Sequence, residues 1–374
     1  MQLNLKAKMR MKIKTNKSIL VFLLVQSIIF SKNYFIYATA ESEDEVSLLR
    51  FDGNKIYLHE NIKVGVNPVE IEGPHGINIS PDGDYWYLSM AHGVGSPNGI
   101  LYKYSTKTNN IVGQVELGFF PATLEVSRST GLLYIVNFNL HGGHDQISSV
   151  SIVDPEMMIE IERVETGIMP HGSRLLNNGL KHYSVAMMSG ELFELDAAEM
   201  VITRKLKTSN SKMSHHSKMH HNHSNHTMDK SMPTWVYPSP DDKLLYVVNS
   251  GTNEVLEINI KRWSIQRKFS TSKGPYNCEV SNDGKYLVVT YKPDGYTGIW
   301  DLNKGVELAK IKNSRKVSHG VVISPDSKFA FVTVEGIGAQ PGTVDVIDLH
   351  KLKLIDQIDI GKQAGGIAFW KMED

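Results

Sequence analysis

Cysteine is nearly absent from this chain of 374 residues, which contains only Cys278. A single thiol excludes an intrachain disulfide, so stability has to come from a packed core. The sequence also lacks a paired Cys-x-x-Cys, a Cys-rich copper motif, a haem attachment site, a phosphate-binding loop and a nucleophile elbow. No catalytic residue and no organic cofactor site is therefore predicted. Cys278 itself is expected to be a buried small hydrophobe.

Acidic residues are missing from the first forty positions, which hold seven of the 40 basic residues and none of the 40 acidic ones. An apolar run over residues 19–30 follows, but a membrane span needs roughly 20 apolar residues. Ala38-Thr39-Ala40 then has the small-x-small pattern of a signal peptidase site. We interpret residues 1–40 as a removable export signal, with a retained N-terminal anchor as the alternative. The protein is expected to be periplasmic, extracellular or on the cell surface.

Basic residues are in the minority after that segment. Residues 41–374 contain 33 basic and 40 acidic residues, although the whole chain is neutral. Nucleic acids and anionic lipid surfaces bind positively charged protein surfaces. The composition thus predicts no nucleic-acid partner, and membrane contact only through an uncleaved leader.

One ten-residue segment recurs seven times along the chain, and its first copy reads Pro-His-Gly-Ile-Asn-Ile-Ser-Pro-Asp-Gly. The copies begin at Pro74, Pro121, Pro170, Pro233, Pro275, Ser318 and Ala364. The starts are 42 to 63 residues apart, a period that matches a four-stranded propeller blade. The Asp-Gly step forms a tight turn before a β-rich run. The chain is therefore predicted to be all-β, with residues 41–374 forming one seven-bladed β-propeller of four-stranded antiparallel blades.

The two ends of this domain are predicted to share one blade. Residues 46–65 look like two outer strands, and residues 365–370 look like an innermost strand. Joining them closes the ring and leaves no open sheet edge. Only four residues follow Trp370, so this blade is expected to lack its second strand.

Two of the β-rich runs end in Tyr-Ile-Val-Asn137 and Tyr-Val-Val-Asn249. The repeat resembles the YVTN (YncE-like) β-propeller repeat family over residues 44–374. Similar hubs occur in nitrous oxide reductase and the selenium-binding protein (methanethiol oxidase) family, where hub histidines hold copper, and in lactonase-type propellers. The resemblance implies the fold, but one fold hosts many chemistries. The sequence has no second, cupredoxin-type domain, which argues against full nitrous oxide reductase activity.

Equivalent positions of the repeat come together around the axis of a propeller. The second positions are His75, Ala122, His171, Thr234, Tyr276, His319 and Gly365. Loops expected on the same face add His92, His141 and His144. Because imidazole binds copper, zinc, iron and nickel, we predict a metal site at this end of the hub. The alternative is that each histidine only hydrogen-bonds a neighbouring strand.

The longest interval between repeats contains a His/Met-rich insert, residues 208–232. Its candidate ligands are Met213, His215, His216, Met219, His220, His221, His223, His226 and Met228. It has no apolar periodicity, which predicts a flexible loop. Thioethers prefer Cu(I), and such mixed runs look like the copper-handling segments of exported copper-resistance proteins. The insert precedes an innermost strand, so it should leave the ring on the hub-histidine face; the alternative is a solvated polar loop that binds metals only weakly.

Three functions are compatible with these features. The first is an exported propeller that binds a metal ion, copper before zinc or another divalent metal, for metal handling or redox chemistry. The second is a non-enzymatic scaffold whose rim loops 91–99, 138–146 and 335–342 bind a protein or a surface polymer. The third is a lactonase-like hydrolase that uses metal-bound water, for which the sequence offers no dedicated acid–base pair. The recurring acids of the repeat are expected to serve its turns: Asp82, Asp241, Asp283 and Asp326.

Overall fold

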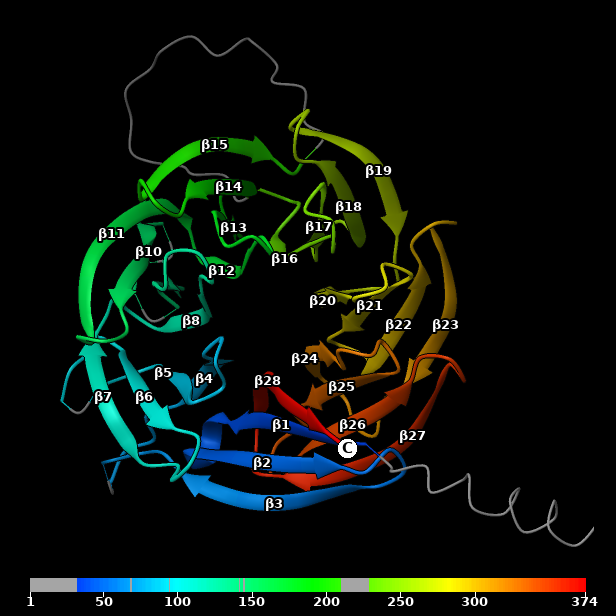
Figure 1. Ribbon diagram of the computed structural model, residues 1–374. Helices are drawn as coiled ribbons and strands as arrows, with labels where there is room; N and C mark the ends of the chain where they lie inside the picture. The colour runs from blue at the N-terminus through cyan, green and yellow to red at the C-terminus, as the bar shows by residue number, and fades with distance from the viewer. Residues whose placement is uncertain (1–31, 68, 94, 141, 144, 210–228) are drawn as a thin grey trace, which may run out of the picture.

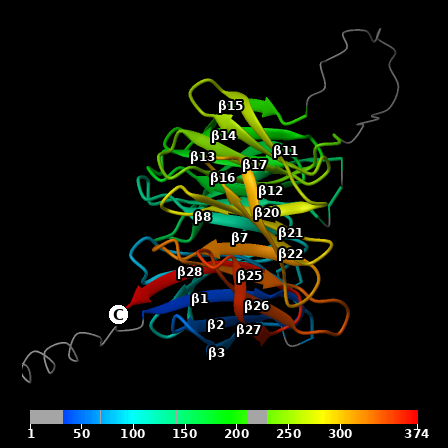
Figure 2. The same cartoon turned by 90° about the vertical axis from the view of Figure 1, so that its right-hand side faces the viewer.

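Seven four-stranded antiparallel sheets surround one axis in the computed structural model (Figure 1). The structure describes residues 32–374 except 68, 94, 141, 144 and 210–228. Figure 2 shows the same ring from its side. Over these described ranges the only helical segment is the 3₁₀ turn Glu41–Glu43, and no helix is long and apolar enough to cross a membrane. The predicted all-β, seven-bladed architecture is confirmed.

The strands of each blade are given from the innermost to the outermost. Blade one has β4 (Pro74–Ile79), β5 (Tyr85–Met90), β6 (Ile100–Ser105) and β7 (Ile111–Glu116). Blade two has β8 (Pro121–Val126), β9 (Leu133–Asn137), β10 (Ile147–Asp154) and β11 (Ile159–Ile168). Blade three has β12 (Pro170–Leu175), β13 (Lys181–Ala186), β14 (Glu191–Asp196) and β15 (Val201–Lys207). Blade four has β16 (Pro233–Pro238), β17 (Leu244–Asn249), β18 (Glu254–Asn259) and β19 (Ser264–Ser270).

The remaining blades follow the same order. Blade five has β20 (Pro275–Val280), β21 (Tyr286–Tyr291), β22 (Tyr296–Asp301) and β23 (Val306–Lys312). Blade six has β24 (Ser318–Ile323), β25 (Phe329–Val334), β26 (Gly342–Asp348) and β27 (Lys353–Ile360). Blade seven has β28 (Ala364–Glu373), β1 (Asn33–Ala40), β2 (Glu45–Phe51) and β3 (Ile56–Lys63). All seven innermost strands begin at the predicted repeat starts.

The burial of each strand follows its distance from the axis. The second strand β9 reads Leu-Tyr-Ile-Val-Asn and is buried throughout, because both faces of its sheet pack against neighbouring blades. The outermost strand β15 alternates between exposed and half-buried residues. Cys278 is fully buried in the core between blades four and five, as predicted.

The repeated acids form the turns after the innermost strands. In four blades a serine hydroxyl donates to the aspartate two residues later at 2.5–2.7 Å. The same serine oxygen accepts the backbone N–H five residues later at 2.9–3.0 Å. The serine–aspartate pairs are Ser80–Asp82, Ser239–Asp241, Ser281–Asp283 and Ser324–Asp326. Their predicted role in the turns is confirmed.

The N-terminal boundary of the domain has to be corrected. Residues 33–40, predicted as the end of the leader, form strand β1, which pairs with both β2 and β28. Seven of its eight residues are buried, and Ala38-Thr39-Ala40 lies inside the sheet. Small and apolar residues are compatible with both a cleavage site and a buried strand, and the small-x-small pattern at residues 38–40 was therefore wrongly assigned to the leader. The propeller starts at Asn33, and blade seven has the second strand that it was expected to lack; residues 1–31, which carry the rest of the predicted leader, lie outside the described residues.

A chain that lacks residues 1–40 should fail to form a stable propeller, whereas a chain that lacks residues 1–31 should fold. Each large β1 side chain, such as Tyr34, Ile36 or Tyr37, contributes about 1.5–3 kcal/mol by its burial. Their combined loss approaches the whole stability of a domain, about 5–15 kcal/mol. Size-exclusion chromatography and thermal melting followed by circular dichroism would compare the two chains. Equal melting temperatures would contradict the assignment of β1 to the fold.

Candidate functional site

A closed belt of hydrogen bonds surrounds the propeller axis. In every blade the carbonyl of the second residue of the innermost strand accepts a hydrogen bond from the preceding blade, with donor–acceptor distances of 2.6–3.4 Å. The pairs, donor first, are Thr39–His75, Ser89–Ala122, Thr123–His171, His171–Thr234, Thr234–Tyr276, Thr290–His319 and Thr333–Gly365. We call these seven bonds the hub belt. Six donors are hydroxyls, and the seventh is the ring of His171.

The glycine that follows each hub histidine allows this close approach. A Cβ added to Gly76 would lie 1.8 Å from the carbonyl oxygen of Ala122, and one added to Gly172 would lie 2.4 Å from that of Thr234. A Cβ added to Gly320 would lie 2.9 Å from the carbonyl oxygen of Gly365. Contacts this short are forbidden to real side chains, so only glycine fits. The belt thereby fixes the backbone from which the histidines project.

Three histidines from distant parts of the chain meet at one end of the hub. The ring centroid of His75 lies 5.9 Å from that of His171 and 5.8 Å from that of His319. Tyr276, at the same repeat position, lies 5.4 Å from His171 and 4.9 Å from His319. All three histidines are at least nine-tenths buried. The repeat register therefore placed these side chains correctly.

The hydrogen bonds of His171 define its tautomer. Its Nδ1 lies 3.2 Å from the carbonyl oxygen of Thr234, which can only accept, so Nδ1 carries the proton. Its Nε2 must then accept from the Tyr276 hydroxyl at 2.9 Å. Burial, with a smaller contribution from His75, lowers the pKa of His171 to about 3. His171 is therefore a neutral imidazole whose Nε2 points to the hydroxyl of Tyr276.

His75 and His319 have different surroundings. The Nδ1 of His75 lies 2.6 Å from a carboxylate oxygen of Glu41, in the turn after β1. Burial and the charge of Lys292 hold the pKa of His319 well below its usual value. The Nε2 of His319 is 3.8 Å from Glu335, which pairs with Lys292 at 2.8 Å, and its buried Nδ1 forms no hydrogen bond of normal geometry. His319 is thus a neutral imidazole with an unused nitrogen.

Of the other predicted ligands, His92 is the one that the structure describes on this face. Its ring lies 6.4 Å from that of Phe120, which stands 5.2 Å from the ring of His75. His141 and His144 lie outside the described residues, as do all nine candidate ligands of the insert. Within the portion of the chain that is described, no three His, Cys, Asp or Glu side chains are grouped closely enough to hold a metal ion as they stand.

The two ends of the insert are held together on the hub-histidine face, as predicted. The Ser209 hydroxyl donates to Asp229 at 2.9 Å, and the backbone N–H of Asp229 donates to the Met188 carbonyl at 3.2 Å. Met188 packs on a buried cluster that contains Phe138, whose ring lies 4.8 Å from that of His171. The base of the insert therefore adjoins the shell of apolar side chains around the histidines.

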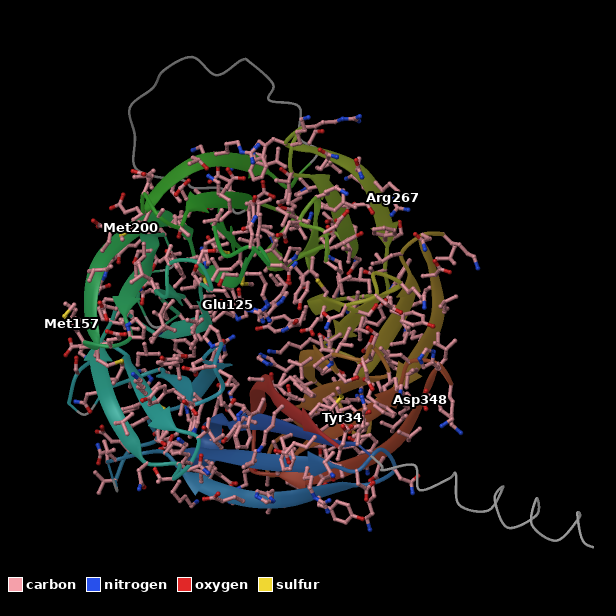
Figure 3. All side chains as sticks on the ribbon, viewed as in Figure 1. Tyr34, Glu125, Met157, Met200, Arg267 and Asp348 are labelled. Carbon is pink, nitrogen blue, oxygen red and sulfur yellow. The ribbon has the colours of Figure 1, made fainter. Side chains whose placement is uncertain are left out.

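The fifth position of the repeat forms a second ring around the axis, which was not predicted from the sequence and in which five of the seven side chains are polar. These residues are Asn78, Glu125, Arg174, Tyr237, Glu279, Val322 and Ala368. A cavity of about 310 Å³, the hub chamber, is lined by members of this ring and by the three hub histidines. Figure 3 labels Glu125 on the inner side of its blade. The repeat register that located the histidines would have found this ring as well.

Solved structures with the same architecture establish the fold alone. A chain of Kuenenia stuttgartiensis hydrazine synthase matches with a TM-score of 0.64 and 19% identity, covering 82% of this chain and 92% of that chain. A functionally unknown protein from Desulfotomaculum acetoxidans DSM 771 matches with a TM-score of 0.68 and 12% identity, covering 90% and 98%. No protein-family model and no curated protein matches the sequence. At these low identities, the similarity shows that the chain is a β-propeller and gives no information about its activity.

The buried histidines should make the fold sensitive to acid. His182, between blades two and three, stacks on Tyr134 with no hydrogen bond to either ring nitrogen, and burial lowers its pKa to about 3. An ordinary histidine has a pKa of 6.5. As the pH falls below this value, His182 binds a proton in the unfolded chain but not in the folded protein, so the free energy of unfolding decreases.

We expect His182→Phe to reduce this loss by about 1.4 kcal/mol per pH unit between about pH 6 and pH 4. Urea unfolding at several pH values would measure the slope. His59→Phe, on the exposed strand β3, should leave the slope unchanged. An unaltered slope in His182→Phe would show that His182 is protonated in the folded protein.

Proposed function

We propose that this chain is an exported β-propeller of the YVTN type that binds a metal ion, first of all copper, through His75, His171 and His319. The observation that carries the proposal is the meeting of three buried histidines around the axis, with centroids 5.8–5.9 Å apart for the two pairs that His75 makes. Three imidazoles bound to one ion at about 2.0–2.1 Å would have centroids about 5 Å apart. The two separations that His75 makes are within about 1 Å of this value, so a metal ion would have to draw the three rings together.

The chemistry of the three rings fits a metal ion. Neutral imidazole is the form that binds metals, and burial keeps His171 and His319 neutral. Metal-binding histidines usually donate their other N–H to a carboxylate or a backbone carbonyl. Glu41 stands in that position for His75, and the Thr234 carbonyl does so for His171. In this arrangement Nε2 of both rings is the nitrogen available to an ion.

The role of each residue follows from these contacts. His75, His171 and His319 would hold the ion, while Glu41 and the hub belt orient the rings. Tyr276, now bound to His171, would have to release its hydrogen bond. Lys292 and Glu335 form a neutral pair at the edge of the cluster. A bound copper ion would supply Lewis acidity or one-electron transfer.

The His/Met-rich insert supports copper as the first choice of metal. Its methionines and histidines suit both oxidation states of copper, whereas thioethers have little affinity for harder divalent ions. Ser209 and Asp229, at the two ends of the insert, hydrogen-bond each other, and Asp229 also bonds the Met188 carbonyl on the face where the hub histidines lie. We propose that the insert collects metal ions for the hub site.

Copper titration of untagged, metal-free protein should give one hub site and additional sites from the insert. A variant that lacks residues 210–228 keeps both Ser209 and Asp229, so the ring of seven blades should stay intact. This variant should retain one Cu(II) ion with imidazole nitrogen couplings in its electron paramagnetic resonance spectrum. Calorimetry would give the stoichiometry of both proteins.

In the same deletion background, His319→Phe should weaken copper binding by about ten-fold or more, because it removes one ligand. The matched control is His350→Phe, on the exposed turn after β26, which should leave the affinity unchanged. Unchanged stoichiometry and affinity in His319→Phe and in His75→Phe would overturn the hub site. Absence of any stoichiometric metal would favour a recognition scaffold.

A further inference from the structure

Tyr276 completes a closed ring of four side chains at the second position of the repeat. The four project from β4, β12, β20 and β24, so their order around the axis is His75, His171, Tyr276 and His319 (Figure 1). The ring centroid of Tyr276 lies 5.4 Å from that of His171 and 4.9 Å from that of His319. His75 lies 5.9 Å and 5.8 Å from the same two histidines. Tyr276 therefore stands across from His75, between the other two hub histidines.

The hub belt does not account for this side chain. Thr234 donates to the backbone carbonyl of Tyr276, and any residue at this position would supply that carbonyl. The other second positions without a histidine hold the smaller residues Ala122, Thr234 and Gly365. The size of Tyr276 and its hydroxyl are therefore not required by the belt.

The hydroxyl of Tyr276 lies at the distance that separates two ligands of one metal ion. Its oxygen is 2.9 Å from Nε2 of His171, the nitrogen that the proposed site uses for that histidine. Two ligand atoms that are each about 2.0–2.1 Å from an ion, at an angle of roughly 90–109°, lie about 2.8–3.4 Å apart. An ion can therefore replace the hydrogen-bond proton through a rotation of the rings, with little change in the separation of the two atoms.

A lysine ammonium stands beside the ring of Tyr276. The Nζ atom of Lys292 lies 4.2 Å from the ring centroid and 2.8 Å from a carboxylate oxygen of Glu335. Only 30% of the lysine side chain is exposed. A cation this close favours the negative form of its neighbour, and the ion pair with Glu335 holds the ammonium in place. The surroundings of Tyr276 therefore suit a phenolate.

We propose that Tyr276 is the fourth ligand of the hub metal site and binds Cu(II) through its phenolate oxygen. This inference rests on the proposed function and adds a ligand to it. The hydroxyl proton passes to solvent as the copper–oxygen bond forms, and nothing is oxidised or reduced. Three imidazoles and one anionic oxygen suit tetragonal Cu(II), whereas Cu(I) prefers thioethers. The hub therefore takes the oxidised ion.

Visible absorption of the untagged full chain during titration with Cu(II) detects this ligand directly. A phenolate bound to Cu(II) gives a charge-transfer band in the visible range, and resonance Raman excitation within that band enhances the ring vibrations of the tyrosine. The His/Met-rich insert contains no tyrosine, so copper bound there cannot give these vibrations. We expect the band and the tyrosine vibrations to grow together and to saturate when the hub site is filled.

Tyr276→Phe keeps the aromatic ring and removes the oxygen, so it should reduce the band at least ten-fold. The matched control is Tyr57→Phe on the outermost strand β3, where Lys55 lies 5.7 Å from the ring, and it should leave the band unchanged. The Raman measurement on the unaltered chain decides the matter if Tyr276→Phe does not fold.

The outcomes separate this inference from the hub site itself. A hub copper ion in the titrations of the histidine variants, without the band or the tyrosine vibrations, would overturn the phenolate ligand and leave the three-histidine site standing. Absence of hub copper would overturn both. A band that persists in Tyr276→Phe would belong to another tyrosine and would also contradict the proposal.

Discussion

The hydrogen bond from each blade to the second carbonyl of the next innermost strand is the constraint on which the rest of the hub depends. A hydroxyl of the second strand is the usual donor, as with Ser89, Thr290 and Thr333. Where that position is valine, in blades two, three and four, the donor comes from the innermost strand instead. Buried carbonyls need partners, so the belt is completed by whichever side chain can reach.

His171 shows how this constraint serves two purposes. In blade three the usual donor position holds Val185, and the ring of His171 closes the belt through Nδ1. That bond fixes both the tautomer and the direction of Nε2. The structural role of His171 in the belt is therefore compatible with the ligand role that we propose for it.

The repeat register predicted all seven innermost strands and the meeting of His75, His171 and His319, because residues at equivalent positions share one axis. It did not predict Glu41, Lys292 or Glu335, since these lie in loops where the repeat has no fixed length. Strand β1 escaped prediction because its apolar and small residues also suit a leader. The ring of Glu125, Arg174 and Glu279 was within reach of the same register, but unlike residue types at one position leave no visible pattern.

Blade seven joins the first described strand to the last. Thr39 donates to His75, Glu41 orients that ring, and the carbonyl of Gly365 in β28 accepts the final belt bond. During synthesis on the ribosome, His75 is the first of the three hub histidines to emerge and has its partners nearby, whereas His171, His319 and strand β28 follow much later. Until β28 has been synthesised, one edge of β1 stays unpaired and the hub lacks its seventh innermost strand. Completion of the hub therefore waits for β28, which follows the other described strands in chain order.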